Sequence, residues 1–409
     1  MKISIIIPTH NRADQLKTAI DSIVLLRDEA DCELIVVDNN STDNTPSVVN
    51  EYGEFARYVF EPRTAFTRAR STGGENATGD ILLFLDDDVI VNKGSLANIV
   101  RVFSEHQDCA VIAGKIDPKF EVEPPAWTLD CQKTFNGWSL FNKESFSFIH
   151  DSLQEVPSAA GPMMAIRRDV YDRIGGFPPD TVGVETNRGN NVFNKLYIGP
   201  GDYGLCIKAR EAGFKILYSP DISVFHVIPA ARLSVAFWRS RMIGEGYHDA
   251  ITQRAFFHKS VMELSIKRLR TKLLFRYSEW KLLNKIKNSQ QTGKDELLPE
   301  ELWVNLYKAY LDMDKILETT PRLVEFLWGI GIEGVNDENF ELIISKLPHD
   351  FKSIVGDGFI YNSQTITTQS DYKKFITRNG MSRPGSGLFL NVIFPLFLIA
   401  KFFKNRLQN

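Results

Sequence analysis

Apolar and polar residues alternate in blocks along the first ninety positions. Short apolar runs, rich in β-branched residues, predict buried strands at 3–8, 32–38, 57–62 and 80–88. Between them, apolar residues recur at helical spacing, as at 13, 16, 19, 20 and 23, and predict helices over 11–26, 45–53 and 64–78. We expect Asn11 to cap the first helix. Strands that alternate with helices are typical of a doubly wound, parallel α/β sheet.

Polar residues capable of chemistry follow three of these strands. They are Thr9–Arg12 after the first, Asp38–Asn40 after the second and Asp86–Asp88 after the fourth. Ligands of open α/β sheets bind at the carboxyl ends of the strands, so the sequence predicts a site there.

The fourth strand, "DILLFLDDD", runs directly into three aspartates. Like charges repel one another, and a divalent cation with oxygen ligands would relieve the repulsion. Strand alternation would place Asp86 and Asp88 on one side and Asp87 on the other. An acidic turn without a ligand is the alternative.

Composition limits the function classes. The chain has 409 residues, of which 43% are hydrophobic, enough for one large domain with appendages or for two domains. A net charge of −3 does not favour nucleic acid as a partner. The four cysteines form no CxxC pair, which argues against a disulfide framework or zinc site and fits a reducing cytosol. We find neither a signal-peptide pattern nor an apolar run of about 18 residues.

Five segments in order resemble the family 2 glycosyltransferases. They are "SIIIPTHNR", "ELIVVDNNSTDNT", "TRARSTGGENATGDILLFLDDDV", "PMMAIRRDVYDRIGGF" and "GDYGLCIKAREAGFKILYSPDISVFHV". The resemblance covers residues 1 to about 250 and implies a GT-A type fold, an α/β, doubly wound, mostly parallel sheet. It implies a nucleotide-binding half at 1–115 and an acceptor-binding half at 116–250. Past residue 250 the resemblance fades, and helical periodicity predicts a mainly helical region at 251–409.

The resemblance also implies a donor-binding set. Its members are Pro8, Thr9, Asn11, Arg12, Asp38, Arg70, Asp86, Asp87 and Arg232. Asp38 would hydrogen-bond the base, usually uracil, because a carboxylate accepts from an imide N–H. Asp88 and His226 would ligate Mn²⁺ or Mg²⁺.

Asp202 matches the family's catalytic base, which takes a proton from the acceptor hydroxyl in an inverting transfer. The family usually has G-E-D-x-D/E-L here, whereas this chain has "GPGDYGLC". Gly201 and Gly204 replace the two further acids. A catalytically weak or inactive nucleotide-sugar-binding or scaffold protein is therefore an alternative to the enzyme.

Each site residue also has a purely structural interpretation. These are a turn cap for Asp38, a solvated helix position for Arg70, a helix N-cap for Asp202, a packing role for His226 and a surface position for Arg232. Trp127 and Trp138 could stack on a sugar or fill a core. A nucleotidyltransferase would need a glycine-rich basic loop, which "PTHNRADQ" lacks.

Two C-terminal segments combine apolar and basic residues. Residues 259–287 carry nine Lys or Arg against two Glu and predict a basic amphipathic helix. Residues 388–406 are apolar and then basic. Either segment could contact an anionic membrane or pack within the protein or between subunits. The expected enzyme is thus metal-dependent and uses a UDP-sugar donor. Its acceptor would be a glycan or lipid-linked sugar, and its location the cytoplasm at the inner face of the cell membrane.

Overall fold

The computed structural model describes residues 1–63, 66–128, 152–178, 201–234, 261–288 and 299–319, with a few positions between 237 and 253. The described residues form two compact units, 1–234 and 235–319. Trp138 and the apolar tail at 388–406 lie outside the described residues. The assignment of 1–115 and 116–250 to donor and acceptor stays a prediction.

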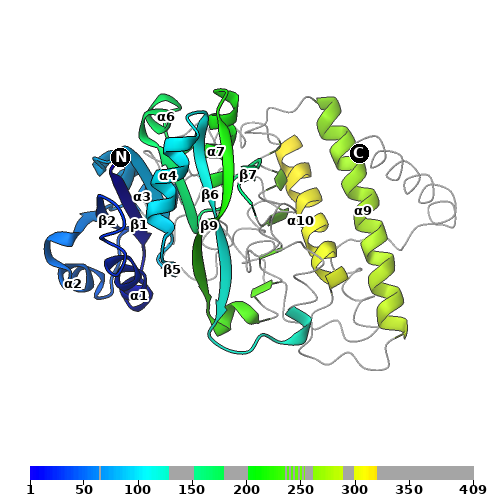
Figure 1. The fold of residues 1–409 in the computed structure, drawn as a ribbon. Helices are drawn as coiled ribbons and strands as arrows, with labels where there is room; N and C mark the ends of the chain where they lie inside the picture. Colours follow the sequence, from blue (N-terminus) through cyan, green and yellow to red (C-terminus); the bar gives the residue numbers. More distant parts are fainter. Residues whose placement is uncertain are drawn as a thin grey trace. The chain divides into compact units, whose positions relative to one another are not determined.

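The first unit is built on a nine-stranded sheet of order β3-β2-β1-β4-β8-β6-β9-β5, with β7 paired to β9 (Figure 1). The strands are β1 (Ile3–Thr9), β2 (Cys32–Asp38), β3 (Ala56–Phe60), β4 (Ile81–Leu85), β5 (Val89–Val91), β6 (Cys109–Phe120), β7 (Gln154–Glu155), β8 (Met163–Arg167) and β9 (Lys215–Ile228). Strands β1 to β4 are parallel, as predicted. Strand β8 lies antiparallel between β4 and β6, so the sheet as a whole is mixed.

Helices cover both faces of this sheet because the strands are buried on both sides. Helices α1 (Ala13–Val24), α2 (Thr45–Asn50) and α4 (Ser95–Glu105) pack on the face that carries Ile5. Helices α3 (Phe66–Asn76), α6 (Arg168–Arg173) and α7 (Gly201–Glu211) pack on the face that carries Ile6. Burial of each large aliphatic side chain contributes about 1.5–3 kcal/mol, which explains the continuous apolar strands.

The start of α1 differs from the prediction. Asn11 does not cap the helix, because the amide of Ala13 donates instead to the carboxylate of Asp43, at 3.0 Å. Asn11 has a left-handed backbone, with φ of 53°, and its side-chain oxygen accepts the amide of Thr42 at 2.7 Å. Asn11 therefore ties the end of β1 to the loop after β2, in a conformation that asparagine tolerates.

The second unit contains α9 (Val261–Asn288) and α10 (Pro299–Thr319), which lie side by side (Figure 1). Arg268 of α9 pairs with the buried Asp314 of α10 and donates to Glu318 at 2.8 Å. The predicted helical character of this region is confirmed for α9 and α10. Within the described part of the chain, no helix combines the length and apolarity that a membrane span requires.

Glu61, just after β3, organises the connection to α3. Its buried carboxylate accepts hydrogen bonds from Thr72 Oγ1 at 2.6 Å and from Arg68 Nε at 3.0 Å, both in α3. The backbone amide and Nε of Arg63 donate to it at 3.0 and 3.1 Å. Burial opposes ionisation, but these donors outweigh it and lower the pKa of Glu61 to about 2.

Glu61→Gln is expected to lower the free energy of unfolding by about 1–3 kcal/mol at pH 7. Because the folded-state pKa lies below the ordinary 4.5, this stabilisation is present above pH 4.5 and is lost as pH falls toward about 2. Urea titrations of both proteins between neutral and acidic pH measure the difference. The exposed Glu54→Gln should change stability by less than about 0.5 kcal/mol. A difference for Glu61→Gln that stays constant with pH would contradict this account.

Candidate active site

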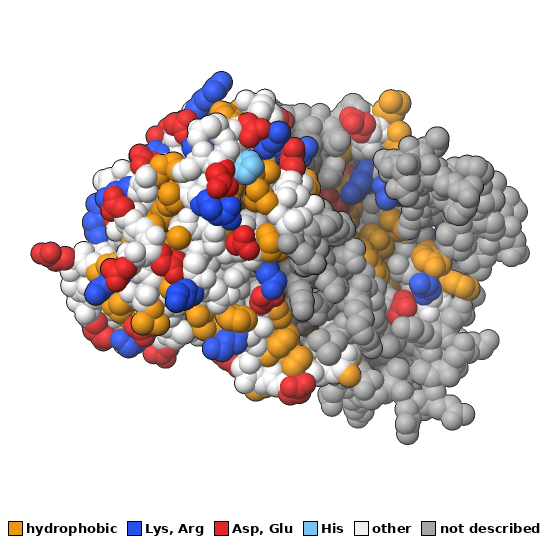
Figure 2. All heavy atoms as spheres, viewed as in Figure 1, with side chains coloured by type: hydrophobic (Ala, Val, Ile, Leu, Met, Phe, Trp, Pro, Cys, Tyr) orange, Lys and Arg blue, Asp and Glu red, His pale blue; other side chains and the backbone are white. Residues whose placement is uncertain are grey.

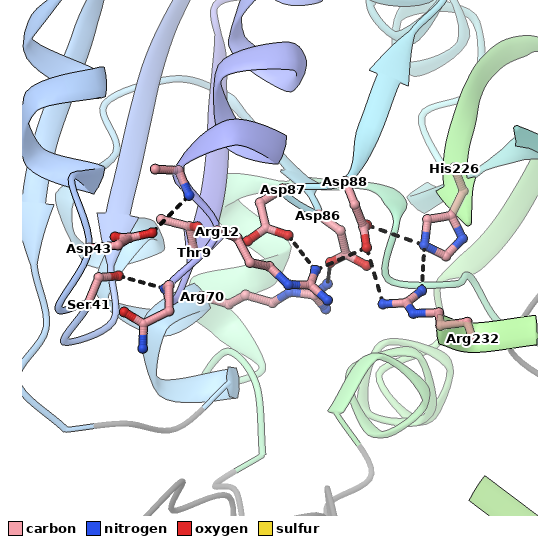
Figure 3. A network of polar contacts seen from close by, with 12 residues as sticks. Thr9, Arg12, Ser41, Asp43, Arg70, Asp86, Asp87, Asp88, His226 and Arg232 are labelled. Carbon is pink, nitrogen blue, oxygen red and sulfur yellow. Dashed lines mark hydrogen bonds and ion pairs between the residues drawn. The ribbon is translucent and has the colours of Figure 1, made fainter. Parts of the chain in front are cut away.

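The three aspartates lie in a turn rather than on the strand. Strand β4 ends at Leu85 and β5 begins at Val89, so strand alternation does not extend to Asp86, Asp87 and Asp88. Each carboxylate instead pairs with at least one arginine, and Arg12 is shared by Asp87 and Asp88 (Figure 3). A core strand can end on three like charges here because arginines from different parts of the chain compensate them.

Asp87 joins the ends of β1 and β4. Thr9 Oγ1 donates to one of its oxygens and Arg12 Nη1 to the other, each at 2.8 Å. Burial and the neighbouring charge of Asp88 raise the pKa of Asp87 to about 6, against the opposing effect of Arg12. Strand order reverses between β1 and β4, which is where open α/β sheets bind ligands.

Asp88 lies where β5 meets β9. Val89 is opposite His226 in the antiparallel ladder, and the amide of Val227 donates to the carbonyl of Asp88 at 2.8 Å. This pairing brings His226 Nε2 to 3.3 Å from Asp88 Oδ1. Arg12 and Arg232 contact the other oxygen at 3.0 and 3.2 Å.

The electrostatics of Asp88 favour its charged form. Burial alone would raise its pKa, but His226, Arg232 and Arg12 outweigh burial and lower the pKa to about 2. Asp88 is therefore an anion at neutral pH although it is almost completely buried.

Asp88 and His226 fit a divalent cation by the chemistry of their donors. A carboxylate oxygen beside an imidazole nitrogen suits Mn²⁺, and two protein ligands suffice when substrate phosphates supply others. The guanidinium of Arg232 contacts both side chains, with Nη2 at 3.2 Å from Asp88 Oδ2 and Nη1 at 3.1 Å from His226 Nε2. No cluster of three or more His, Cys, Asp or Glu suited to a metal occurs among the residues that the structure describes.

Arg70 connects the aspartate turn to α7. Its side chain is completely buried, so the interpretation as a solvated helix residue is wrong. Nη2 donates to Asp86 Oδ1 at 2.7 Å and to the carbonyl of Gly161 at 3.1 Å, while Nη1 pairs with Asp202. Burial works against the charge of Arg70, but the two carboxylates outweigh it and raise the pKa of the guanidinium.

Asp202 lies in the first turn of α7, one residue after Gly201. Burial raises the pKa of its carboxyl, and Arg70 opposes the rise. Gly201 has φ of 34°, which favours glycine, although a Cβ there would have Thr67 Cγ2 as its nearest neighbour, at 3.7 Å. A side chain at 201 would therefore meet backbone strain rather than lack of space.

Gly161 permits the contact between Arg70 and Asp202. A Cβ at this position would lie 2.7 Å from Arg70 Nη2 and closer still to Asp202 Oδ2. The small residues at 159–161 could serve ligand approach or tight packing, and at Gly161 the structure shows tight packing against the ion pair. The glycine in "SAAGP" was the available signal, although its two partners could not be read from the sequence.

Asp38 ends β2 and is buried. One oxygen accepts the amide of Ser41 at 2.8 Å, so the turn-cap interpretation is confirmed. The other accepts Tyr58 OH at 2.7 Å, and burial together with this bond raises the pKa of Tyr58 to about 12. Sequence reasoning missed Tyr58, which two-residue alternation places on the same sheet face as Phe60, the residue opposite Asp38.

The structure therefore brings most of the predicted residues together. Thr9, Arg12, Asp87, Asp88, His226 and Arg232 form one polar cluster (Figure 3). Arg70, Asp86 and Asp202 form a second. Asn11 and Asp38 lie in the neighbouring loops, and Pro8 is buried in β1 opposite Val37. Their roles toward a ligand stay predictions.

Known proteins of similar sequence include glycosyltransferases. The model of the family described as glycosyl transferase family 2 matches residues 4–175. A glucosyl-dolichyl phosphate glucuronosyltransferase of Haloferax volcanii is 20% identical over 264 residues, which is 61% of this chain and 77% of the relative. The O-antigen chain rhamnosyltransferase WbaN of Salmonella anatum is 23% identical over 47% of this chain and 56% of its own length.

Residues 4–175 thus form a family 2 glycosyltransferase domain, and the domain together with these relatives supports a glycosyltransferase activity. Among solved structures, a mannosyltransferase of Pyrobaculum calidifontis in complex with GDP-Man and Mn²⁺ is similar. It is 17% identical, with a TM-score of 0.42, over 92% of this chain and 86% of that one.

Gly161→Ala is expected to lower the turnover of donor by about tenfold or more, because the new methyl group displaces Arg70 from Asp202. Single-turnover kinetics measure the chemical step directly, and circular dichroism checks the fold. Gly94→Ala is the matched control, since it strains a left-handed backbone with φ of 87° outside the polar clusters. It should cost about 1 kcal/mol of stability and leave turnover unchanged. Equal turnover in Gly161→Ala and the unaltered protein would show that turnover does not depend on the pairing of Arg70 with Asp202.

Proposed function

We propose that this glycosyltransferase moves a sugar from a nucleotide-diphosphate sugar, a UDP-sugar, to a hydroxyl acceptor with inversion at the anomeric carbon. The observation that carries the proposal is that Arg70 contacts both Asp86, in the aspartate turn, and Asp202, in α7. Asp86, which would bind the donor, and Asp202, which would act as the base, thus share the buried guanidinium of Arg70.

The donor would lie at the carboxyl ends of β1, β2 and β4. Asp38 would face the base, while Arg12 and Arg232 would supply positive charge near the diphosphate. Asp88 and His226 would hold Mn²⁺ or Mg²⁺ beside them, as their 3.3 Å separation permits. The ion, when bound, would offset the negative charge that develops on the leaving diphosphate.

Asp202 would act as the base. Its carboxylate takes the proton of the acceptor hydroxyl as that oxygen bonds to the anomeric carbon and the bond to the diphosphate breaks on the opposite side. Burial supports this role because it raises the pKa of Asp202 and makes the carboxylate a better proton acceptor. Arg70 would fix the orientation of the carboxylate.

The proposed acceptor is a lipid-linked or growing surface glycan. Support comes from the names of the relatives, a glucosyl-dolichyl phosphate glucuronosyltransferase and an O-antigen chain rhamnosyltransferase. Such acceptors would place the enzyme at the inner face of the cell membrane, as a monomer or an oligomer.

A second candidate is a protein of the same fold that binds a nucleotide sugar without turnover. Gly201 and Gly204 favour it, since Asp202 is the sole acid in the first turn of α7. Turnover of a donor distinguishes the two functions.

Asp202→Asn is expected to reduce Mn²⁺-dependent donor hydrolysis by about 100-fold or more, because asparagine cannot take the proton. A panel of nucleotide sugars, with and without Mn²⁺, is assayed for release of the nucleoside diphosphate, and donor binding is measured by thermal shift. The control is Asp221→Asn, which alters an exposed surface ion pair with Arg101 and should leave both readouts unchanged. Donor binding without turnover in the unaltered protein would favour the scaffold. Full turnover in Asp202→Asn would exclude Asp202 as the base.

A further inference from the structure

Helix α9 has a buried side and, on nearly the opposite side, a row of large apolar side chains. Residues 264, 271, 275, 278 and 282 are buried and recur at intervals of seven, four and three. Arg268, which fits the same series, pairs with Asp314 of α10, so this side faces the neighbouring helix. It accounts for the packing of α9 within the second unit.

The apolar row, which we call the outer stripe, comprises the exposed Met262, Ile266, Leu269 and Trp280 and the half-buried Leu273. Each member lies two residues before a position of the buried series, and two residues correspond to about 200° around a helix. The outer stripe therefore lies on nearly the opposite side of α9. Met262, Ile266 and Leu269 are 71%, 59% and 60% exposed, and Trp280 is 37% exposed.

Exposed large apolar side chains in such a row are uncommon on a soluble surface. In the first unit, by contrast, acidic and basic side chains are interspersed over the visible face (Figure 2). The outer stripe thus calls for an apolar partner along some 18 residues of helix, about 27 Å.

The charge of α9 selects the kind of partner. The helix carries eight Lys or Arg and two Glu. Glu279 pairs with Arg276, and Asp249 pairs with Lys267. Acidic groups of the second unit therefore neutralise two of these basic side chains. The exposed Arg270, Lys272 and Lys281 flank the outer stripe.

A second copy of this chain fits poorly against such a surface. Two α9 helices packed through their outer stripes would bring flanking cations of both copies together, at the cost of like-charge repulsion. An anionic lipid surface complements both features, because acyl chains accept the apolar row and headgroups attract the flanking cations. Trp280 stacks with Tyr277, and such aromatic side chains favour the membrane interface.

We propose that α9 lies in the plane of an anionic membrane surface with its outer stripe among the acyl chains. This inference goes beyond the sugar transfer and does not depend on the donor or the base.

The test is co-sedimentation of the full-length protein with vesicles of phosphatidylcholine alone and of phosphatidylcholine with phosphatidylglycerol. Binding to the anionic vesicles should be at least about tenfold stronger and should weaken with added salt. Ile266→Ser combined with Leu269→Ser should reduce binding by about tenfold or more. Arg270→Gln combined with Lys272→Gln should weaken binding and flatten the salt dependence.

Leu25→Ser is the matched control, because Leu25 is 85% exposed but lies in the first unit, and it should bind vesicles like the unaltered protein. Circular dichroism verifies that the variants keep their helices. Binding that is absent, or that the double serine variant retains, would overturn the proposal. So would a dimer, seen by light scattering, that the double serine variant converts to a monomer. Donor hydrolysis, assayed in solution, should be unchanged in these variants, so a failed transferase and a failed membrane contact are told apart.

Discussion

The buried guanidinium of Arg70 is the interaction on which the rest of the site depends. It pairs with Asp86, 16 residues further along the chain, and with Asp202, 132 residues further along. A buried charge is tolerated only while its partners stay in place, and removing one partner typically costs about 3–5 kcal/mol. The aspartate turn and the first turn of α7 are therefore held in one geometry. Gly161 is part of the same constraint, because its missing side chain is the space that the ion pair occupies.

A second set of ion pairs fixes the neighbouring cluster. Arg12 contacts both Asp87 and Asp88, and Arg232 contacts both Asp88 and His226. Thr9 and Arg12 lie at the end of β1, and Asp87 and Asp88 follow β4, so this part of the cluster lies where the strand order reverses. Arginines thus hold charged oxygens in fixed positions before any ligand arrives. In the proposed transfer, such preorganisation would support electrostatic stabilisation of the leaving diphosphate.

Much of this could be predicted from sequence, for identifiable reasons. The apolar runs at 3–8 and 32–38 can bury both faces only inside a parallel sheet, so β1, β2 and their helices followed directly. The family motifs pointed to Arg70, Asp88, Asp202 and His226, and the structure places these residues in two polar clusters that meet at the aspartate turn. Strand alternation failed for Asp86–Asp88 because β4 stops at Leu85, a boundary that the apolar pattern does not mark. The Asn11 cap failed because Asp43, 30 residues from Ala13 in the chain, supplies the oxygen instead. Long-range contacts of this kind, like those of Tyr58 and Glu61, depend on register and packing that a single sequence does not specify.

The account depends on Asp88 and His226 holding a divalent ion beside the nucleotide-sugar donor. The most direct measurement is the anomalous scattering of Mn²⁺ in crystals grown with manganese and a nucleotide sugar. The account predicts a single strong peak within coordination distance of Asp88 and His226, with Arg232 withdrawn from His226 and the diphosphate completing the coordination. A bound nucleotide sugar with no peak at these two side chains, or a peak elsewhere on the sheet edge, would contradict it.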